Sequence, residues 1–334
     1  MATIATPQRP HRRTLWRVLR WALVIVVPPL VALTAFALLR PLDLLVASTQ
    51  LRLWFDGIQS EYTQIPFAGS PSVRVHYFVG GSGPPVVLVH GLGGRAEDWA
   101  HLMPQLVRDH HRVYAPDLPG YGRSASPAGA TYSIPEESQA LEAFLDNRHL
   151  SRIDLGGWSM GGWIAMRVAI DQPQRVRRLM IFDSAGLRWD LKWDTSLFWP
   201  QTAQQLRQLN DLLRATPPPA VPGFIAHAIF HYVALHGWVV QRSMHSMLTG
   251  HALLDGKLGA LKMPMLIVWG KQDHLIPVSV AEDIHHEVPQ SELEIFDGCG
   301  HLAPNLCASR VGPVVKGFLD EATPLAGREA VIPK

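Results

Sequence analysis

The stretch "GGWSMGGW", residues 156–163, places one serine, Ser159, among four glycines directly after the apolar run "RIDL". Glycine weakens both strands and helices, so four glycines at one point need a structural reason. A sharp turn from a strand into a helix supplies one, because it leaves no room for a Cβ at Gly157 or Gly161. A flexible glycine-rich loop is the alternative, and the pattern G-x-S-x-G alone does not decide between them.

Apolar segments of strand length alternate with helical patterns on both sides of this turn. The predicted strands are 72–79, 84–90, 111–117, 151–157, 177–185, 263–270 and 292–298, and the predicted helices lie near 97–108, 134–147, 160–171, 278–287 and 308–320. This alternation predicts an α/β fold with a mostly parallel central sheet flanked by helices. In such sheets, chemistry collects at the carboxyl ends of the strands.

Three side chains with complementary chemistry follow three of these predicted strands, in the order Ser159, Asp273 and His301. A serine hydroxyl needs a base that titrates near neutrality, and imidazole is such a base. The imidazole in turn needs a carboxylate that fixes its tautomer and stabilises its cation. The three residues therefore predict nucleophilic catalysis by a serine.

The glycine-rich segment "HGLGG", residues 90–94, follows a fourth predicted strand. The negative oxygen that forms on a substrate during acyl transfer needs N–H donors that are already in place. A turn of this kind can aim the Leu92 amide at the same oxygen as the Met160 amide. We therefore expect these two backbone groups to form an oxyanion hole.

From about residue 65 to 320 the chain resembles the α/β-hydrolase superfamily. The matching segments are "HGLGG" (90–94), "DLPGYGRS" (117–124), "GWSMGG" (157–162), "WGKQDHLIP" (269–277) and "GCGH" (298–301). The resemblance implies the α/β-hydrolase fold, with Ser159 as nucleophile, Asp273 as acid, His301 as base, and the Leu92 and Met160 amides as oxyanion hole. "SMGG" and the N-terminus are similar to the monoacylglycerol-lipase-like branch. We expect no metal and no cofactor.

Other polar residues near these strand ends have rival interpretations. Asp183, in "FDSAG", is an alternative acid, although Asp273 stands in the commoner place. Asp117 is expected to brace a turn, and His90 to hold the backbone of residues 90–94. His274 adjoins Asp273 but is expected on the surface.

Residues 186–262 lack a convincing strand and are rich in large aromatic side chains. The resemblance identifies this interval as a helical cap inserted into a core of residues 65–185 and 263–323, with a tail at 324–334. We expect Trp199 and Trp238 of the cap to contact the substrate. The cap histidines His227 and His231, four residues apart, have metal ligation as an alternative role.

Residues 1–40 combine a basic N-terminus with the uncharged run Trp21–Leu39, which is about long enough to cross a membrane. Five arginines precede the run, so the positive-inside rule predicts a cytoplasmic N-terminus and a catalytic domain on the non-cytoplasmic (periplasmic) side. A signal peptide cleaved after "AFA" (35–37) is the alternative. Residues 41–64 are expected to form a juxtamembrane amphipathic linker.

Only two cysteines, Cys299 and Cys307, occur in the 334 residues. They are expected to pair if the domain is exported, and to be free thiols in a reducing compartment. The net charge is +2, and because five arginines lie in the first 20 residues, the rest of the chain is slightly acidic. This distribution argues against a nucleic-acid partner.

Together these features predict a membrane-associated serine carboxylester hydrolase, a lipase or esterase that acts on a small-molecule ester or a lipid such as a monoacylglycerol. A serine at the turn directs the chemistry to acyl transfer. A carbon–carbon bond hydrolase of aromatic degradation and a cofactor-free perhydrolase could use the same residues. A non-catalytic, membrane-anchored binding protein is the remaining alternative.

Overall fold

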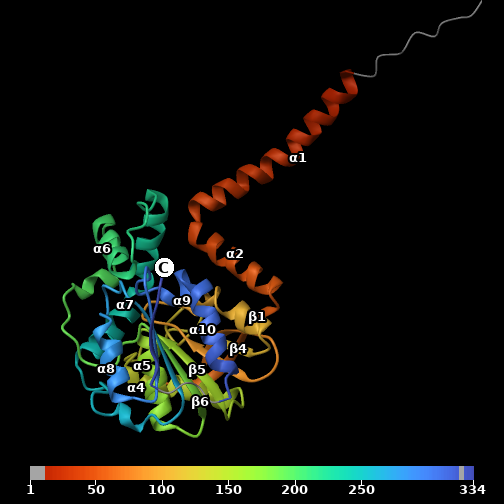
Figure 1. Ribbon diagram of the computed structural model, residues 1–334. Coiled ribbons are helices and arrows are strands. Elements are labelled where there is room, and N and C mark those ends of the chain that lie inside the picture. The colour runs from red at the N-terminus through yellow and green to blue at the C-terminus, as the bar shows by residue number, and fades with distance from the viewer. Residues whose placement is uncertain (1–11, 323–326) are drawn as a thin grey trace, which may run out of the picture.

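The computed structural model describes residues 12–322 and 327–334, and a single twisted sheet runs through its centre (Figure 1). Its strands are β1 (Ile58–Phe67), β2 (Ser70–Gly80), β3 (Pro85–Val89), β4 (Arg112–Pro116), β5 (Ile153–Trp158), β6 (Val176–Phe182), β7 (Met265–Gly270), β8 (Glu292–Phe296) and β9 (Glu329–Ile332). Their spatial order is β1-β2-β4-β3-β5-β6-β7-β8-β9. The pairs β1–β2 and β2–β4 are antiparallel, and every other pair is parallel. The predicted mostly parallel sheet is therefore confirmed.

Helices cover both faces of the sheet. They are the 3₁₀ helix η1 (Ala96–Trp99) and the α-helices α3 (Met103–Arg108), α4 (Ile134–Asn147), α5 (Met160–Asp171), α8 (Ser279–Glu287), α9 (Ala303–Leu306) and α10 (Ala308–Asp320). Leu141 of α4 and Ile164 of α5 belong to one hydrophobic core, while Leu106 of α3 and Val315 of α10 belong to a second. Because the central strands are covered on both sides, they are continuous apolar runs, which the sequence reveals well.

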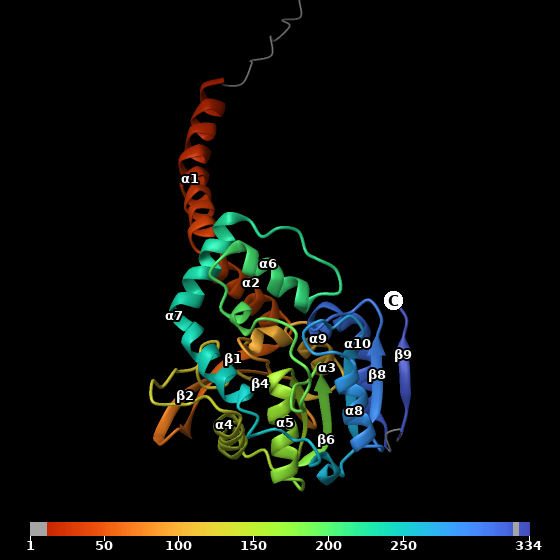
Figure 2. The ribbon, with the colours of Figure 1, turned by 90° about the vertical axis from the view of Figure 1, so that its left-hand side faces the viewer.

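The interval between β6 and β7 is the helical cap. It contains η2 (Thr195–Phe198), α6 (Ala203–Leu213), α7 (Gly223–Leu248) and η3 (Leu258–Ala260). Helix α7 is apolar enough to pass a membrane-span criterion. Val239 and Met244 of α7 are nevertheless buried, and Figure 2 shows the helix lying along the part of the molecule that contains the sheet. Helix α7 is therefore part of the cap.

The N-terminal part forms two helices that precede the sheet. Helix α1 (Arg12–Leu39) projects from the body, and α2 (Pro41–Phe55) returns along it (Figures 1 and 2). The 20 residues Arg20–Leu39 meet the criterion for a membrane span and have no buried residue. Pro41 stands at the first position of α2. Its missing N–H costs no hydrogen bond there, because the first amides of a helix have no acceptor within the helix.

One predicted boundary is wrong, and the predicted C-terminal tail is part of the sheet. The linker was expected to reach residue 64, but β1 begins at Ile58 and pairs with β2 along its length. The C-terminal tail contains β9, which pairs in parallel with β8. Both segments lie at an edge of the sheet, where only one side of a strand is paired and the apolar pattern is weak. The core boundary at 323 and Arg9 of the basic N-terminus lie outside the described residues.

Candidate functional site

Ser159 lies at the sharp turn between β5 and α5, and its backbone has φ 56° and ψ −120°. A Cβ on Gly157 would lie 2.1 Å from the Gly161 carbonyl oxygen, and one on Gly161 would lie 2.3 Å from the Val89 carbonyl oxygen. The Ser159 amide donates to the Phe182 carbonyl at 2.9 Å. The glycines are therefore required by close backbone approach, and the flexible-loop alternative is wrong.

Asp273 and His301 lie in direct contact after β7 and β8. The distance from His301 Nδ1 to Asp273 Oδ2 is 2.7 Å, and both side chains are buried. Asp273 Oδ1 accepts hydrogen bonds from the amides of Leu275 (2.8 Å) and Ile276 (2.9 Å). Because these amides occupy one carboxylate oxygen, the other is held toward the imidazole. The contact fixes Nδ1 as the protonated nitrogen and leaves Nε2 as the basic one.

The indole of Trp158 also positions the histidine. Its Nε1 donates to the His301 carbonyl oxygen at 2.8 Å. Trp158 immediately precedes Ser159, so one residue joins the serine turn to the histidine loop. Sequence reasoning missed this role, because a tryptophan at the end of a buried strand is indistinguishable from a core residue until the loop after β8 is placed.

The oxyanion loop, residues 90–94, approaches Ser159 closely. A Cβ on Gly91 would lie 3.1 Å from Ser159 Cβ, and the Gly94 amide donates to the Gly91 carbonyl at 3.0 Å. His90 Nδ1 donates to the Gly91 carbonyl (2.8 Å), while its Nε2 accepts from the Leu118 amide (3.1 Å). Burial lowers the pKa of His90, so it stays neutral and bridges backbone groups, as predicted.

Two further sequence predictions concern carboxylates near the site. Asp117 accepts from the amides of Ala96 (2.6 Å) and Arg123 (2.9 Å), so it braces a turn as expected. Asp183 is fully buried, and its Oδ1 accepts from the Gly270 amide at 2.7 Å. Burial and then the charge of Asp273 raise the pKa of Asp183 well above its usual value. Asp183 is therefore a neutral neighbour of Asp273, which is the residue that contacts the imidazole.

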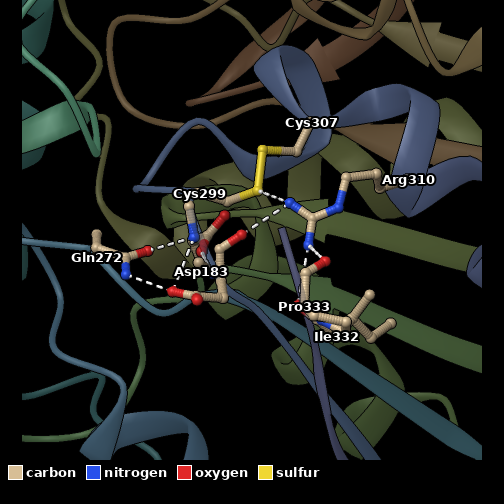
Figure 3. Close-up of a disulfide and its surroundings, with 10 residues drawn as sticks. Asp183, Gln272, Cys299, Cys307, Arg310, Ile332 and Pro333 are labelled. Carbon is tan, nitrogen blue, oxygen red and sulfur yellow. Dashed lines mark hydrogen bonds between the residues drawn. A yellow bond between two sulfur atoms is a disulfide. The ribbon is translucent and has the colours of Figure 1, made fainter.

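His274 lies on the surface, as predicted. The two cysteines form a disulfide, Cys299–Cys307 (Figure 3), and His301 lies between them in the sequence. Arg310 lies beside this bond and donates to Cys299 Sγ and to the Asp297 carbonyl. Its second terminal nitrogen donates to the Ile332 carbonyl, so it also holds the C-terminal strand. The sequence carried no signal for this role of Arg310.

Ser159 opens on a cavity of about 180 Å³ between the sheet and the cap. Most of its lining is apolar, and the only charged lining residue is Arg188. The large aromatic residues of the lining are Trp163, Trp189, Trp193 and Phe198. The prediction for Trp199 and Trp238 is therefore wrong: the ring of Trp238 packs against Tyr132, 5.6 Å away between centroids.

Comparison with known proteins agrees with the fold and the resemblance described above. A family described as "alpha/beta hydrolase fold" matches residues 84–229 and 233–304. The 2-hydroxymuconate semialdehyde hydrolase of Pseudomonas sp. (strain CF600) is 31% identical over 268 residues, which cover 75% of this chain and 92% of that protein.

Two solved structures share the fold at lower identity. The first is a membrane phospholipase A described as a bacterial virulence factor, with a TM-score of 0.75, 24% identity, and coverage of 90% of this chain and 98% of the other. The second is the 2-hydroxy-6-oxo-6-phenylhexa-2,4-dienoate hydrolase of Rhodococcus sp. strain RHA1, with a TM-score of 0.66, 23% identity, and coverage of 79% and 100%.

Proposed function

Since the chain belongs to the α/β-hydrolase family, we propose that it is a membrane-anchored serine hydrolase that cleaves carboxylic esters of lipids. One observation carries the proposal: Ser159 opens on an apolar, aromatic cavity in a chain whose first helix is long enough to span a membrane. An acyl chain gains about 0.8 kcal/mol for each methylene that such a cavity removes from water.

The proposed reaction begins with attack of Ser159 Oγ on the ester carbonyl. The proton of the hydroxyl passes to Nε2 of His301, whose cation is stabilised by Asp273. The negative oxygen is bound by the amides of Leu92 and Met160, the latter at the first position of α5, where the helix dipole favours negative charge. His301 then gives the proton to the leaving alcohol, and water releases the acid by the reverse sequence.

A lipid substrate is favoured over a small polar ester by the lining of the cavity. The solved membrane phospholipase A matches 90% of this chain, more than the hydrolase core alone contains, so the likeness extends into the N-terminal helices. That protein shares the fold, and its description as a membrane phospholipase A supports the lipid proposal by analogy.

The test separates an enzyme from a non-catalytic binding protein. The wild-type chain in detergent should be labelled by a fluorophosphonate probe, and Ser159→Ala should not, because labelling requires an activated serine. Wild-type enzyme that has not been exposed to the probe should release fatty acid from monoacylglycerol and phospholipid in mixed micelles, and pre-labelled enzyme should not. Absence of labelling in folded protein would contradict catalysis by Ser159.

A carbon–carbon bond hydrolase is the second candidate. Curated hydrolases of 2-hydroxymuconate semialdehyde and of 2-hydroxy-6-oxo-2,4-heptadienoate are 31% and 30% identical to the chain. The second of these substrates, 2-hydroxy-6-oxo-2,4-heptadienoate, is a carboxylate anion. The guanidinium of Arg188, which lines the cavity, would pair with such a carboxylate. Rapid cleavage of a vinylogous diketone acid that falls in Arg188→Gln, with no turnover of neutral esters, would select this candidate.

We place the catalytic domain on the non-cytoplasmic side of the membrane. The arginines before the apolar run and the Cys299–Cys307 disulfide support this orientation, because disulfides persist in oxidising compartments. Reporter fusions after residue 60 should be active only outside the cytoplasm. If the mature protein instead begins at Leu38, the segment is a cleaved signal peptide and not an anchor.

A further inference from the structure

A second cavity, of about 610 Å³, lies between the end of α1, the start of α2 and the first half of α7. We call it the juxtamembrane cavity. Its apolar lining includes Leu38 and Leu39 of α1 and Phe224 and Leu235 of α7. It shares no lining residue with the cavity at Ser159, so the two are separate sites.

The position of this cavity follows from the proposed anchor, on which the inference rests. The segment Arg20–Leu39 spans about 30 Å at 1.5 Å per residue, the thickness of a hydrocarbon core. Leu38 and Leu39 end that segment, so the cavity begins where the hydrocarbon ends. A lipid whose acyl chains lie beside α1 therefore has its headgroup at the height of the cavity.

Two opposite charges lie at the mouth of the cavity. Arg40 and Asp43 both line it, their side chains are 69% and 60% exposed, and Nη1 of Arg40 is 3.5 Å from Oδ2 of Asp43. A guanidinium binds a phosphate through charged hydrogen bonds, and a carboxylate binds a primary ammonium. A zwitterionic phospholipid carries both partners a few bonds apart.

We propose that the juxtamembrane cavity binds the headgroup of a phospholipid with a primary ammonium, such as phosphatidylethanolamine. Arg40 takes the phosphate, Asp43 takes the ammonium, and the leucines of α1 contact the first methylenes of the acyl chains. The match of charges and the continuity with α1 select a lipid from the surrounding membrane.

Two side chains, those of Tyr232 and Arg95, connect the cavity to the oxyanion loop at residues 90–94. Tyr232, which lines the cavity, has the guanidinium of Arg95 over its ring at 5.1 Å. Arg95 directly follows the loop at residues 90–94, and its amide donates to Oδ2 of Asp98 at 2.8 Å. A headgroup that restrains Tyr232 thereby restrains Arg95, so lipid binding is expected to order the loop and raise ester turnover.

Binding is tested on the full-length Ser159→Ala chain in detergent, which cannot consume the lipid. Native mass spectrometry should show one bound dioleoyl-phosphatidylethanolamine, held about tenfold more tightly than dioleoyl-phosphatidylglycerol, the factor for one charged hydrogen bond. Asp43→Asn should remove this preference, because only phosphatidylethanolamine carries the ammonium, whereas Arg40→Gln should weaken binding of both lipids, because both carry the phosphate. Arg52→Gln, on the same helix but outside the cavity, is the matched control and should keep the preference.

Equal binding of the two lipids by the unsubstituted headgroup site, a preference that survives Asp43→Asn, or binding that Arg40→Gln does not weaken would overturn the proposal. A dimer that excludes the lipid would do so too, because the occupant would then be a second copy of the chain. If Arg52→Gln also removes the preference for phosphatidylethanolamine, the preference comes from the overall charge of α2. That result would also count against binding in the cavity.

The link to the loop is tested on the wild-type chain in nanodiscs with p-nitrophenyl butyrate, a soluble ester. Phosphatidylethanolamine should raise kcat at least about twofold over phosphatidylglycerol, in proportion to the loop order that it adds. Tyr232→Leu should lose this response and Tyr232→Phe, which keeps the aromatic ring, should retain it. An unchanged kcat would overturn the link. If no ester is turned over while lipid binding persists, the proposed function fails and the lipid site stands.

Discussion

The serine turn and the cap face the same cavity, but the chain specifies them differently. At the turn, backbone atoms within 2.1–2.3 Å of a hypothetical Cβ leave glycine as the only residue that fits at Gly157 and Gly161. In the cap, Trp189 lines the cavity while Trp199, chemically the same, does not. A site held by backbone contacts is thus readable from residue types, whereas a lining made of interchangeable aromatic side chains depends on how the helices are placed.

The strongest test of the backbone-held part is the exchange Asp273→Asn. An amide cannot stabilise the imidazolium of His301 and favours the wrong tautomer, so kcat should fall by about 10⁴. The measurement is ester hydrolysis with matched amounts of protein, whose folding is checked by circular dichroism. Asp183→Asn is the control and should keep most of the activity. If the two variants behave in the opposite way, Asp183 is the acid and the assignment is wrong.

The next largest effect concerns the disulfide between Cys299 and Cys307. The double variant Cys299→Ser/Cys307→Ser releases a loop with a sequence separation of 8. In the chain-entropy treatment, opening a loop of this size lowers the free energy of unfolding by about 2.5 kcal/mol. Urea denaturation of the detergent-solubilised chain measures this difference. Wild-type protein treated with a reductant should show the same loss, and two alkylatable thiols in untreated, non-reduced protein would contradict the pairing.

Most of the sheet could be predicted from the sequence, because its central strands are buried on both faces and are continuous apolar runs. The edge strands β1 and β9 could not, since β1 buries only three of its ten residues and β9 is four residues long with none buried. Asp273 and His301 were found because chain order and strand ends suffice to locate them. Trp158 and Arg310 act through contacts 143 and 22 residues away along the chain, which no local pattern reveals.

The cap is tested by Trp189→Ala, which removes an aromatic wall of the cavity. Burial of part of an acyl chain against this ring is worth about 1.5 kcal/mol, so kcat/KM for octanoate esters should fall roughly tenfold. Acetate esters do not reach the wall and should change little. Trp199→Ala is the matched control and should leave the whole chain-length profile intact. A uniform loss on all chain lengths would show that Trp189 supports the fold instead of the acyl group.

The last effect is expected from Asp183→Asn, and it lies in the pH dependence of stability. The raised pKa means that folded protein keeps a proton on Asp183 which the unfolded chain releases above about pH 4. Wild-type stability therefore falls as pH rises from about 4 toward the folded pKa, by at most about 1.4 kcal/mol per pH unit. Asparagine does not titrate, and its oxygen can still accept from the Gly270 amide. The free energy of unfolding of the variant should therefore increase relative to that of the wild type as pH rises.

This gain is measured as the difference in the free energy of unfolding between variant and wild type at pH 5, 6 and 7, from urea titrations. Asp297→Asn is a suitable control, because a hydrogen bond from Gln272 lowers the pKa of that half-buried carboxyl. A lowered pKa reverses the sign: folded Asp297 stays ionised where the unfolded chain takes up a proton, so its contribution is present above about pH 4 and constant from 5 to 7. If the stability difference for Asp183→Asn does not change with pH, then Asp183 is ionised beside Asp273. The assignment of Asp183 as a neutral carboxyl would then be wrong.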